Sequence, residues 1–230
     1  MSSSALPTLN SHQVKEVDAL AHERFGISVE WLMEAAGWQV ARFCRDATTV
    51  VCGVGNNAGD GLAAARHLHR WGKLKRVCCI DLARLQGPAA RELVALRRTG
   101  VEVGGEIRLE GAETVVDAIF GTGLTRRPEG RFAQWIEAIN SSKVRVVSVD
   151  VPSGLDADSG VAYSPCVQAH TTVTLGPPKP GLLAGDGPQH AGEVWLADIG
   201  VPFEAYAMAG VHVPPDLFSN SDRVRLDSIR

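Results

Sequence analysis

Three short segments of this chain combine small residues with oxygen-bearing side chains, and each follows an apolar or β-branched run. The first is Gly53-Val54-Gly55-Asn56-Asn57-Ala58-Gly59-Asp60-Gly61, the second runs from Asp117 to Arg127, and the third from Asp150 to Asp156. Carboxyl groups can transfer protons or bind cations, and glycine-rich backbone can bind phosphate through its N–H groups. These segments are the candidate functional site.

The glycine segment fits a dinucleotide-binding pattern. Gly53, Gly55 and Ala58 match G-x-G-x-x-[GA], and Asp81 lies 26 residues beyond Gly55, near the place of a ribose-binding acid. On these residues alone, an NAD-dependent oxidoreductase is one interpretation. The pattern is weak evidence because glycine loops of this kind are common.

The polar residues of the same segment fit that interpretation poorly. A Rossmann turn binds pyrophosphate through backbone N–H groups, and an acid at the start of the helix repels it. Asn56, Asn57 and Asp60 are therefore candidates for another chemistry. The alternative is a local role, in which Asp60 caps the helix and the two asparagines tolerate left-handed backbone.

The second segment combines a buried acid with a basic loop. Asp117 ends an apolar run, and a buried carboxylate needs a partner or an ion. The loop after it offers backbone amides, the hydroxyl groups of Thr122 and Thr125, and the guanidinium groups of Arg126 and Arg127. This combination predicts a phosphate site.

The third segment places Asp150 at the end of a strand, followed by Ser153. Ser153 lies outside a G-x-S-x-G motif and no histidine is placed to activate it, so we do not expect a nucleophilic serine. Asn57, Asp117 and Ser153 all offer oxygen atoms at strand ends, and one carboxylate with neutral partners favours a monovalent cation. A hydrogen-bond network without a metal is the alternative.

Strands and helices alternate around these segments. Continuous apolar runs predict buried strands, and 3.6-residue periodicity predicts helices. The fold class that follows is α/β, a three-layer αβα sandwich with a Rossmann-like, mostly parallel sheet and N-terminal helices. In such a sheet, ligands bind beyond the carboxyl ends of the strands. The predicted helices are 11–25, 30–43, 61–71, 88–98 and 132–139, and the predicted strands are 48–54, 76–80, 113–120, 144–149, 171–175 and 193–197.

Length and composition bound the remaining possibilities. The 230 residues fit one domain over 1–230, with 203–230 as a possible tail or the start of an absent second domain. A formal net charge of −3 argues against a nucleic-acid or membrane-surface binder. Five cysteines without C-x-x-C spacing favour a reducing compartment. The uncharged start from Met1 to Asn10 does not resemble a signal peptide, so we expect a cytoplasmic protein.

Taken together, the segments resemble one family. The run from Gly55 to Leu68, the run from Val116 to Leu124 and the run from Val149 to Asp156 are similar to motifs of the NAD(P)H-hydrate epimerase family, a YjeF N-terminal-like domain. Leu32-Met33-Glu34-x-Ala36-Gly37 resembles its N-terminal motif, and the segments 176–182 and 192–202 resemble its C-terminal motifs. The resemblance covers the chain from about Ala5 to Pro202.

The resemblance implies an isomerase for nicotinamide-nucleotide repair. The substrate would be NADH or NADPH hydrated at C6 of the nicotinamide ring, and the R and S forms would be interconverted so that a separate dehydratase can restore the cofactor. It also implies one K⁺ per subunit, bound by Asn57, Asp117 and Ser153, and a homodimer. The implied substrate contacts are Asn56, Asn57, Ala58, Gly59, Asp60, Gly121, Thr122, Gly123, Leu124, Thr125, Arg126, Arg127 and Asp150.

Several points remain open at this level. The family usually has glycine at the position of Ala58, which would matter if the backbone there were left-handed. Lys179 could contact a phosphate or lie on the surface, and Trp31 and Trp38 could be dimer contacts or core residues. Other proteins of this fold are non-catalytic scaffolds, in RNA-decapping assemblies and in apolipoprotein binding, and the oxidoreductase also remains an alternative. The retained acids favour an enzyme, with Asp150 as the group that gives and takes the proton.

Overall fold

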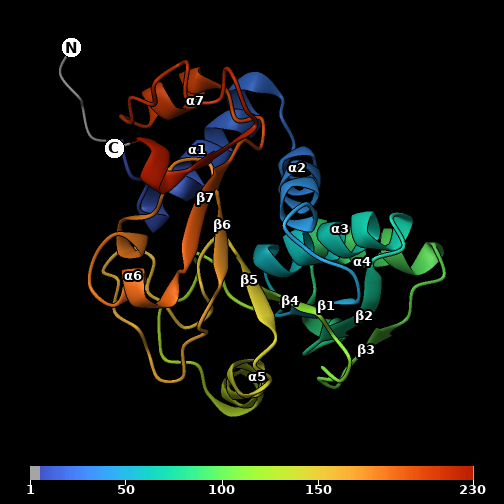
Figure 1. Cartoon of the computed structure of the whole chain (residues 1–230). Helices are drawn as coiled ribbons and strands as arrows, with labels where there is room; N and C mark the ends of the chain where they lie inside the picture. Colours follow the sequence, from blue (N-terminus) through green and yellow to red (C-terminus); the bar gives the residue numbers. More distant parts are fainter. Residues whose placement is uncertain (1–5, 230) are drawn as a thin grey trace.

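Eight strands form a single sheet in the order β3-β2-β1-β4-β5-β6-β7-β8 (Figure 1). The computed structural model describes residues 6–229, without the side chains of 228 and 229. The strands are β1 (Thr48–Cys52), β2 (Leu74–Cys79), β3 (Val103–Gly104), β4 (Thr114–Ala118), β5 (Arg145–Val149), β6 (Thr171–Leu175), β7 (Glu193–Ala197) and β8 (Arg223–Arg225).

The pairing confirms the predicted mostly parallel, Rossmann-like sheet. Neighbouring strands are parallel from β3 through to β7, and only β8 runs antiparallel, against β7. The chain moves outward from β1 to β2 and β3 and then returns to place β4 on the other side of β1. The strand order therefore reverses between β1 and β4, which is where a doubly wound sheet binds its ligand.

Helices cover both faces of this sheet, as the three-layer prediction requires. The α-helices are α1 (Ser11–Phe25), α2 (Val29–Ala41), α3 (Asn56–Arg70), α4 (Gly87–Arg98), α5 (Gly130–Ser141), α6 (Gly187–His190) and α7 (Phe203–Met208), and the 3₁₀ turns are η1 (Leu82–Arg84), η2 (Pro180–Leu182) and η3 (Leu226–Ile229). Figure 1 shows α2, α3 and α4 on one face and α5 on the other.

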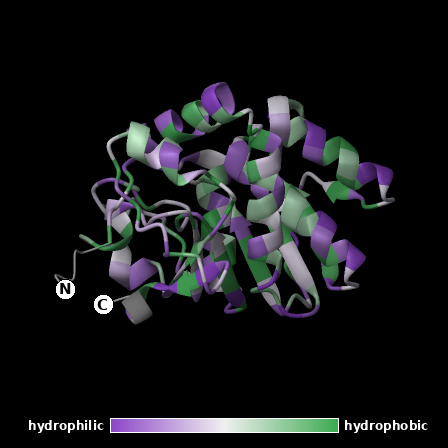
Figure 2. Ribbon diagram, turned by 90° about the horizontal axis from the view of Figure 1, so that it is seen from above, coloured by the Kyte–Doolittle hydropathy of each residue, from purple (hydrophilic) through white to green (hydrophobic). Residues whose placement is uncertain are grey.

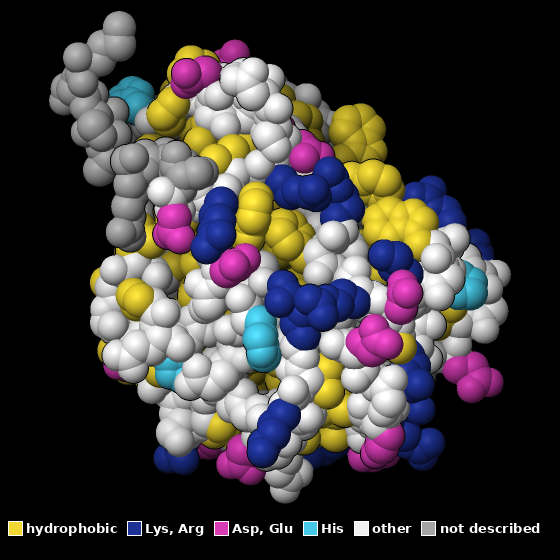
Figure 3. All heavy atoms as spheres, viewed as in Figure 1, with side chains coloured by type: hydrophobic (Ala, Val, Ile, Leu, Met, Phe, Trp, Pro, Cys, Tyr) yellow, Lys and Arg dark blue, Asp and Glu magenta, His cyan; other side chains and the backbone are white. Residues whose placement is uncertain are grey.

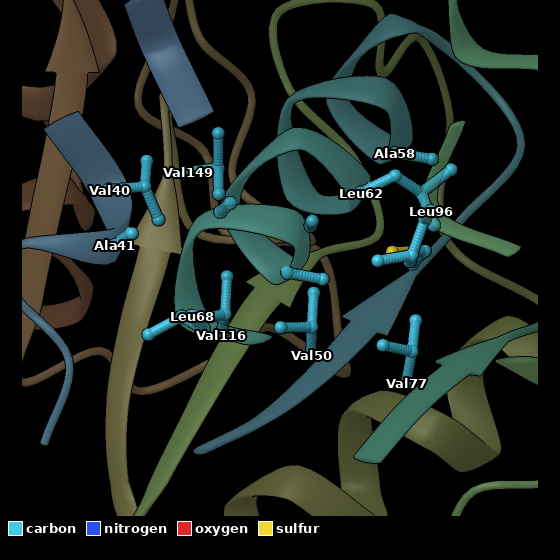
Figure 4. Close-up of a cluster of buried hydrophobic side chains, with 14 of the residues drawn as sticks. Val40, Ala41, Val50, Ala58, Leu62, Leu68, Val77, Leu96, Val116 and Val149 are labelled. Carbon is cyan, nitrogen blue, oxygen red and sulfur yellow. The ribbon is translucent and has the colours of Figure 1, made fainter. Parts of the chain in front are cut away.

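Two apolar clusters hold these layers together. Leu62 and Leu68 of α3 lie over Val50 of β1 and Val116 of β4 in the first cluster (Figure 4). Trp135 and Ile136 of α5 belong to the second cluster, on the opposite face of the sheet. Hydrophilic residues lie mainly on the outer sides of the helices (Figure 2), and side chains of both charges are interspersed on the face shown in Figure 3.

The predicted break between the two N-terminal helices is confirmed and has a local cause. Asn10 caps α1, where its side chain accepts from Gln13 N and the Gln13 side chain accepts from Asn10 N. Gly26 ends the helix with a φ of 70°, a left-handed conformation that glycine adopts at little cost. Ser28 then caps α2.

The start of α3 differs from the prediction. The helix begins at Asn56 rather than near Gly61, so most of the glycine-rich segment is helical. The glycines allow close packing: a methyl group at Gly61 would lie 2.5 Å from Ala118 Cβ, and one at Gly59 would lie 2.5 Å from the Met33 side chain. Composition suggested a loop, but tertiary packing is the reason for these glycines.

The C-terminal segment packs against the domain. Tyr206 of α7 and Val211 share an apolar cluster with Leu9 and Val17 at the N-terminal end of the chain, and β8 extends the sheet. Within the described residues, no helix combines the length and apolar character needed to cross a membrane. The expectation that the start of the chain is not a signal peptide falls in part on residues 1–5, outside the described residues.

Candidate functional site

A cavity of about 430 Å³ lies at the carboxyl edge of the sheet, between the ends of β1, β4, β5 and β6. All three predicted segments reach it. Its polar wall from those segments consists of Asn56, Asn57 and Asp60, then Thr122 with Gly121 and Gly123, and finally Asp150. The N-terminal turn of α3 therefore faces the cavity with backbone N–H groups that have no partner within the helix.

Behind the cavity, Asp117 is fully buried, and both of its carboxylate oxygens accept hydrogen bonds. Its Oδ2 accepts from Ser148 Oγ and from Ser153 N, both at 2.9 Å, and its Oδ1 accepts from Ser153 Oγ at 2.5 Å and from Ile119 N at 3.3 Å. Burial raises the pKa of Asp117, and the donated hydrogen bonds oppose that rise. Ser153 also accepts from Phe120 N at 2.9 Å, which ties the β5 loop to the β4 loop.

Asp117 and Ser153 form this junction, and Asn57 lies beside the β4 loop that belongs to it. A methyl group at Gly121 would lie 3.0 Å from Asn57 Oδ1, so the asparagine side chain contacts the loop that Ser153 also bonds. Asn57 Nδ2 is buried without a hydrogen-bond partner among the described residues. An oxygen-only donor set with a single carboxylate fits a monovalent hard cation.

Asp150 is positioned by an unusual backbone and a buried ammonium group. It has a φ of 67°, which is uncommon for a residue other than glycine and is characteristic of functional sites. Lys179, 1% exposed, forms an ion pair with Asp150 Oδ1 and also donates to Leu175 O at 2.8 Å and Thr174 Oγ1 at 3.2 Å. Lys179 is therefore neither a surface residue nor free for a phosphate, because it holds Asp150.

Two further carboxyl groups face the same cavity and have raised pKa values. Burial raises the pKa of Asp60 well above its usual value, and the nearby Asp150 and Asp18 raise it further. Burial also raises the pKa of Asp18 in α1 to about 6, although Lys179 opposes this rise. The site thus combines an ion-paired carboxylate with two carboxyl groups whose pKa values are raised, which is suitable for acid–base chemistry.

Neither local explanation for the polar glycine segment is correct. Asp60 does not cap α3, because the cap is Gly55 and Asp60 lies one turn inside the helix. Asn56 and Asn57 are helical and have no left-handed backbone. Ala58 is helical as well, so its replacement of the family glycine causes no backbone strain.

The other expected contacts divide into two groups. Ala58 and Gly59 are buried and absent from the cavity wall, because they face the core, where Ala58 joins the apolar cluster and Gly59 packs on Met33. Leu124, Thr125, Arg126 and Arg127 line a second, adjoining cavity. Asp81 caps η1 by accepting from Ala83 N at 3.1 Å.

Sequence reasoning missed Asp18 and Tyr206, which both line the cavity. Asp18 follows Val14 by one helical turn and lies on the apolar face of α1, so an acid on that face was an available signal. Nothing in the local sequence of Tyr206 indicated its place, because α7 reaches the cavity only through its packing on α1.

The reversal of strand order and the acid-lined cavity at its carboxyl edge define a doubly wound α/β protein. Residues 29–181 match the family model described as YjeF-related protein N-terminus. The chain belongs to this family, and the resemblance noted from its motifs is confirmed.

The names of two aligned relatives refer to NAD(P)H-hydrate. An NAD(P)H-hydrate epimerase from Dehalogenimonas lykanthroporepellens is 35% identical, with 86% of this chain and 84% of that protein aligned. A bifunctional NAD(P)H-hydrate repair enzyme from Thermofilum pendens is 40% identical over 83% of this chain, which spans 39% of that longer protein. The crystal structure of the yeast protein ynu0 has a TM-score of 0.80 and 24% identity, and the match covers 96% of this chain and all of that one. That structure supports the fold.

Proposed function

We propose that this chain is an NAD(P)H-hydrate epimerase, which interconverts the R and S forms of NADH or NADPH hydrated at C6 of the nicotinamide ring. The observation that carries this proposal is the pairing of Asp150 with the buried Lys179 at a cavity built from all three motif segments. The names of the aligned epimerases supply the reaction and the substrate class. The acids in the cavity favour this enzyme over a non-catalytic scaffold. No observation specifically favours the alternative NAD-dependent oxidoreductase.

The reaction requires proton transfer at the hydroxyl group of the hydrate. The lone pair of the ring nitrogen expels the protonated hydroxyl as water and leaves a planar iminium ion. Water then returns to either face of C6 and loses a proton, so the ring keeps its oxidation state. Ring opening and closure would reach the same result with the same demands, and general acid–base catalysis typically contributes about 10²- to 10⁴-fold.

Asp150 is our candidate for the group that exchanges this proton. Lys179 holds one carboxylate oxygen, so the carboxylate is oriented and ready to accept a proton from the returning water. Asp60 lines the same cavity, and burial raises the pKa of its carboxyl group, which favours the protonated form. An ion-paired carboxylate beside a carboxyl group with a raised pKa is an arrangement suited to an acid–base pair.

For the substrate, we propose contacts with Asn56, Asn57 and Asp60 of α3, with the loop from Gly121 to Arg127, and with Asp150. For Ala58 and Gly59 we propose an indirect role, because both residues pack on the core and thereby support the first turn of α3. The N-terminus of α3 and the Gly121 loop offer N–H groups to the phosphates.

We propose K⁺ as the cation held by Asn57, Asp117 and Ser153. A singly charged ion supplies little Lewis acidity, so its contribution is electrostatic and positional. The Asp117 hydrogen bonds already join the β4 and β5 loops, and a cation beside them would add the α3 turn through Asn57. The hydrogen-bond network alone is the competing interpretation.

The wider setting follows from the same family membership. We propose a single domain over 1–230 that acts in the cytoplasm. We also propose that it acts together with an NAD(P)H-hydrate dehydratase, because some relatives are named as bifunctional NAD(P)H-hydrate repair enzymes. We also propose a homodimer through the N-terminal helices. Trp31, 67% exposed, is the candidate contact, whereas Trp38 packs on His67 and Trp71 within the chain.

The test of Asp150 uses a mixture enriched in one epimer of hydrated NADH. Chromatography at successive times measures exchange between R and S, and a parallel assay with intact NADH measures hydride transfer. We expect exchange without redox change, and we expect Asp150→Asn to slow it by at least about 100-fold. Asp216→Asn, a change on the exposed surface, is the matched control and should leave the rate unchanged. Exchange at the wild-type rate in Asp150→Asn would refute the assignment.

A further inference from the structure

A second cavity, of about 220 Å³, adjoins the proposed active site on the side of β1 and β2. Val54, Phe120 and Gly123 line both cavities, so the two are neighbours across the β1 and β4 loops. A molecule longer than a nicotinamide ring can therefore extend from the first cavity into the second.

The two cavities differ in charge. The first contains three carboxyl groups, from Asp18, Asp60 and Asp150. The ammonium groups of Lys15 and Lys179 line it as well, so its charges nearly balance and it suits the uncharged hydrated ring. The second is lined by Arg84, Arg126 and Arg127, with Glu129 as its one acid, and suits an anion. Within residues 6–229, no hydrogen bond or ion pair occupies these three guanidinium groups, whereas Arg131 nearby is bonded to Ile80 O and Glu106.

Arg84 occupies a position with a specific meaning in doubly wound sheets. The end of β2 is where such folds distinguish a free ribose 2′-hydroxyl, bound by an acid, from a 2′-phosphate, bound by an arginine. Asp81 is the acid at this place, but it caps η1 by accepting from Ala83 N and lines neither cavity. Arg84, the last residue of η1, is the side chain that lines the cavity.

The same cavity offers an aromatic wall. Phe120 and Phe132 both line it, with ring centroids 4.9 Å apart. Aromatic faces of this kind stack on nucleobases without reading their sequence. An adenine ring beside them would place its ribose toward the arginines that line the same space.

We propose that this second cavity binds the adenosine half of the substrate, and that Arg84, aided by Arg126 and Arg127, binds a 2′-phosphate, so that the enzyme prefers hydrated NADPH to hydrated NADH. The preference rests on the proposed function, whereas the nucleotide site can be tested without any activity. Glu129 limits the net positive charge of the cavity to that of two arginines, which favours a dianionic phosphate over a longer polyanion.

The binding test is calorimetric titration of the whole chain with adenosine 2′,5′-bisphosphate and, separately, with adenosine 5′-monophosphate. The wild-type chain should bind the bisphosphate about tenfold more tightly, because a charge-assisted contact to phosphate is strong. Arg84→Gln should reduce that ratio to within about twofold, and Arg98→Gln, an equal loss of charge on the exposed face of α4, should preserve it. Equal binding of the two nucleotides by the wild-type chain, or an unchanged ratio in Arg84→Gln, would overturn the proposal.

The activity test separates this proposal from the epimerase assignment. If both hold, kcat/KM for epimer exchange should be about tenfold higher with hydrated NADPH, and Arg84→Gln should lower it for that substrate while changing it less than twofold for hydrated NADH. Tighter binding of the bisphosphate without exchange of either hydrate would support the nucleotide site and contradict the epimerase. Exchange with equal kcat/KM for the two hydrates would support the epimerase and contradict the preference.

Discussion

At the scale of single residues, the site depends on how four ionisable groups share one small space. Lys179 neutralises Asp150, while Asp18 and Asp60 face the same ammonium group from the helices α1 and α3. One ammonium cannot pair with three carboxylates in a partly buried cavity, and burial raises the pKa of both Asp18 and Asp60. The consequence is that two carboxyl groups with raised pKa values lie beside the ion-paired Asp150.

The raised pKa of Asp18 predicts a pH-dependent cost in stability. Its pKa is about 6 in the folded chain and near 3.8 when exposed, so the folded state binds this proton more tightly than the unfolded state. The free energy of unfolding therefore falls as pH rises from about 4 to about 6, by roughly 1 to 3 kcal/mol, and then levels off. Asp18→Asn should remove this fall and be more stable than wild type at pH 8.

Urea unfolding at several pH values between 4 and 8 measures this difference. Asp216→Asn, outside the cavity, is the matched change and should follow the wild-type curve. A stability difference between Asp18→Asn and wild type that stays constant across the range would contradict the prediction.

At the scale of elements, α3 carries both the active-site turn and the close contact with the sheet. Its first turn faces the cavity, and Gly61, one turn further, lies against Ala118 of β4 and Cys52 of β1. Because the backbone of α3 lies directly on side chains of the two strands, the position of the turn that contains Asn56 and Asn57 above the strand ends is fixed. The glycines thus contribute to the site through packing.

Gly61→Ala tests whether packing or helix propensity dominates in α3. Propensity alone would stabilise the helix by up to about 1 kcal/mol, whereas the added methyl group would lie 2.5 Å from Ala118 Cβ. We expect a net loss of about 1 to 3 kcal/mol in the free energy of unfolding, because overpacking a buried contact shifts the backbone. Gly105→Ala, which meets no atom within 4 Å, should change stability by less than about 0.5 kcal/mol. Stabilisation by Gly61→Ala would show that α3 can move away from the sheet.

At the scale of the whole molecule, the sheet topology brings together segments that are far apart in the chain. Asn57 follows β1, Asp117 lies near the end of β4, and Ser153 follows β5. These strands are adjacent in the sheet although α4 and α5 intervene in sequence. A cation at this junction would connect all three loops, so its binding should stabilise the entire fold.

Removal of K⁺ should therefore lower the unfolding temperature. Thermal unfolding in KCl and in tetramethylammonium chloride at equal ionic strength compares a cation that fits with one that does not. We expect K⁺ at about ten times its dissociation constant to add roughly 1 to 2 kcal/mol, and Asn57→Ala to remove most of that gain. The same unfolding temperature in both salts would favour the hydrogen-bond network of Asp117 without an ion.

The sequence by itself determined the fold class, the alternation of the major strands and helices, and the three segments of the site, because buried strands and amphipathic helices leave periodic patterns that depend on neighbours in the chain. It did not determine that α3 begins at Asn56, that Lys179 is buried against Asp150, or that Asp18 and Tyr206 enter the cavity. Those facts depend on contacts between elements that are distant in sequence. A local sequence pattern does not predict which distant side chains will be in contact with it. The burial of the acids and their pairing with Lys179, which determine the chemistry of this site, depend on the packing of the helices on the sheet.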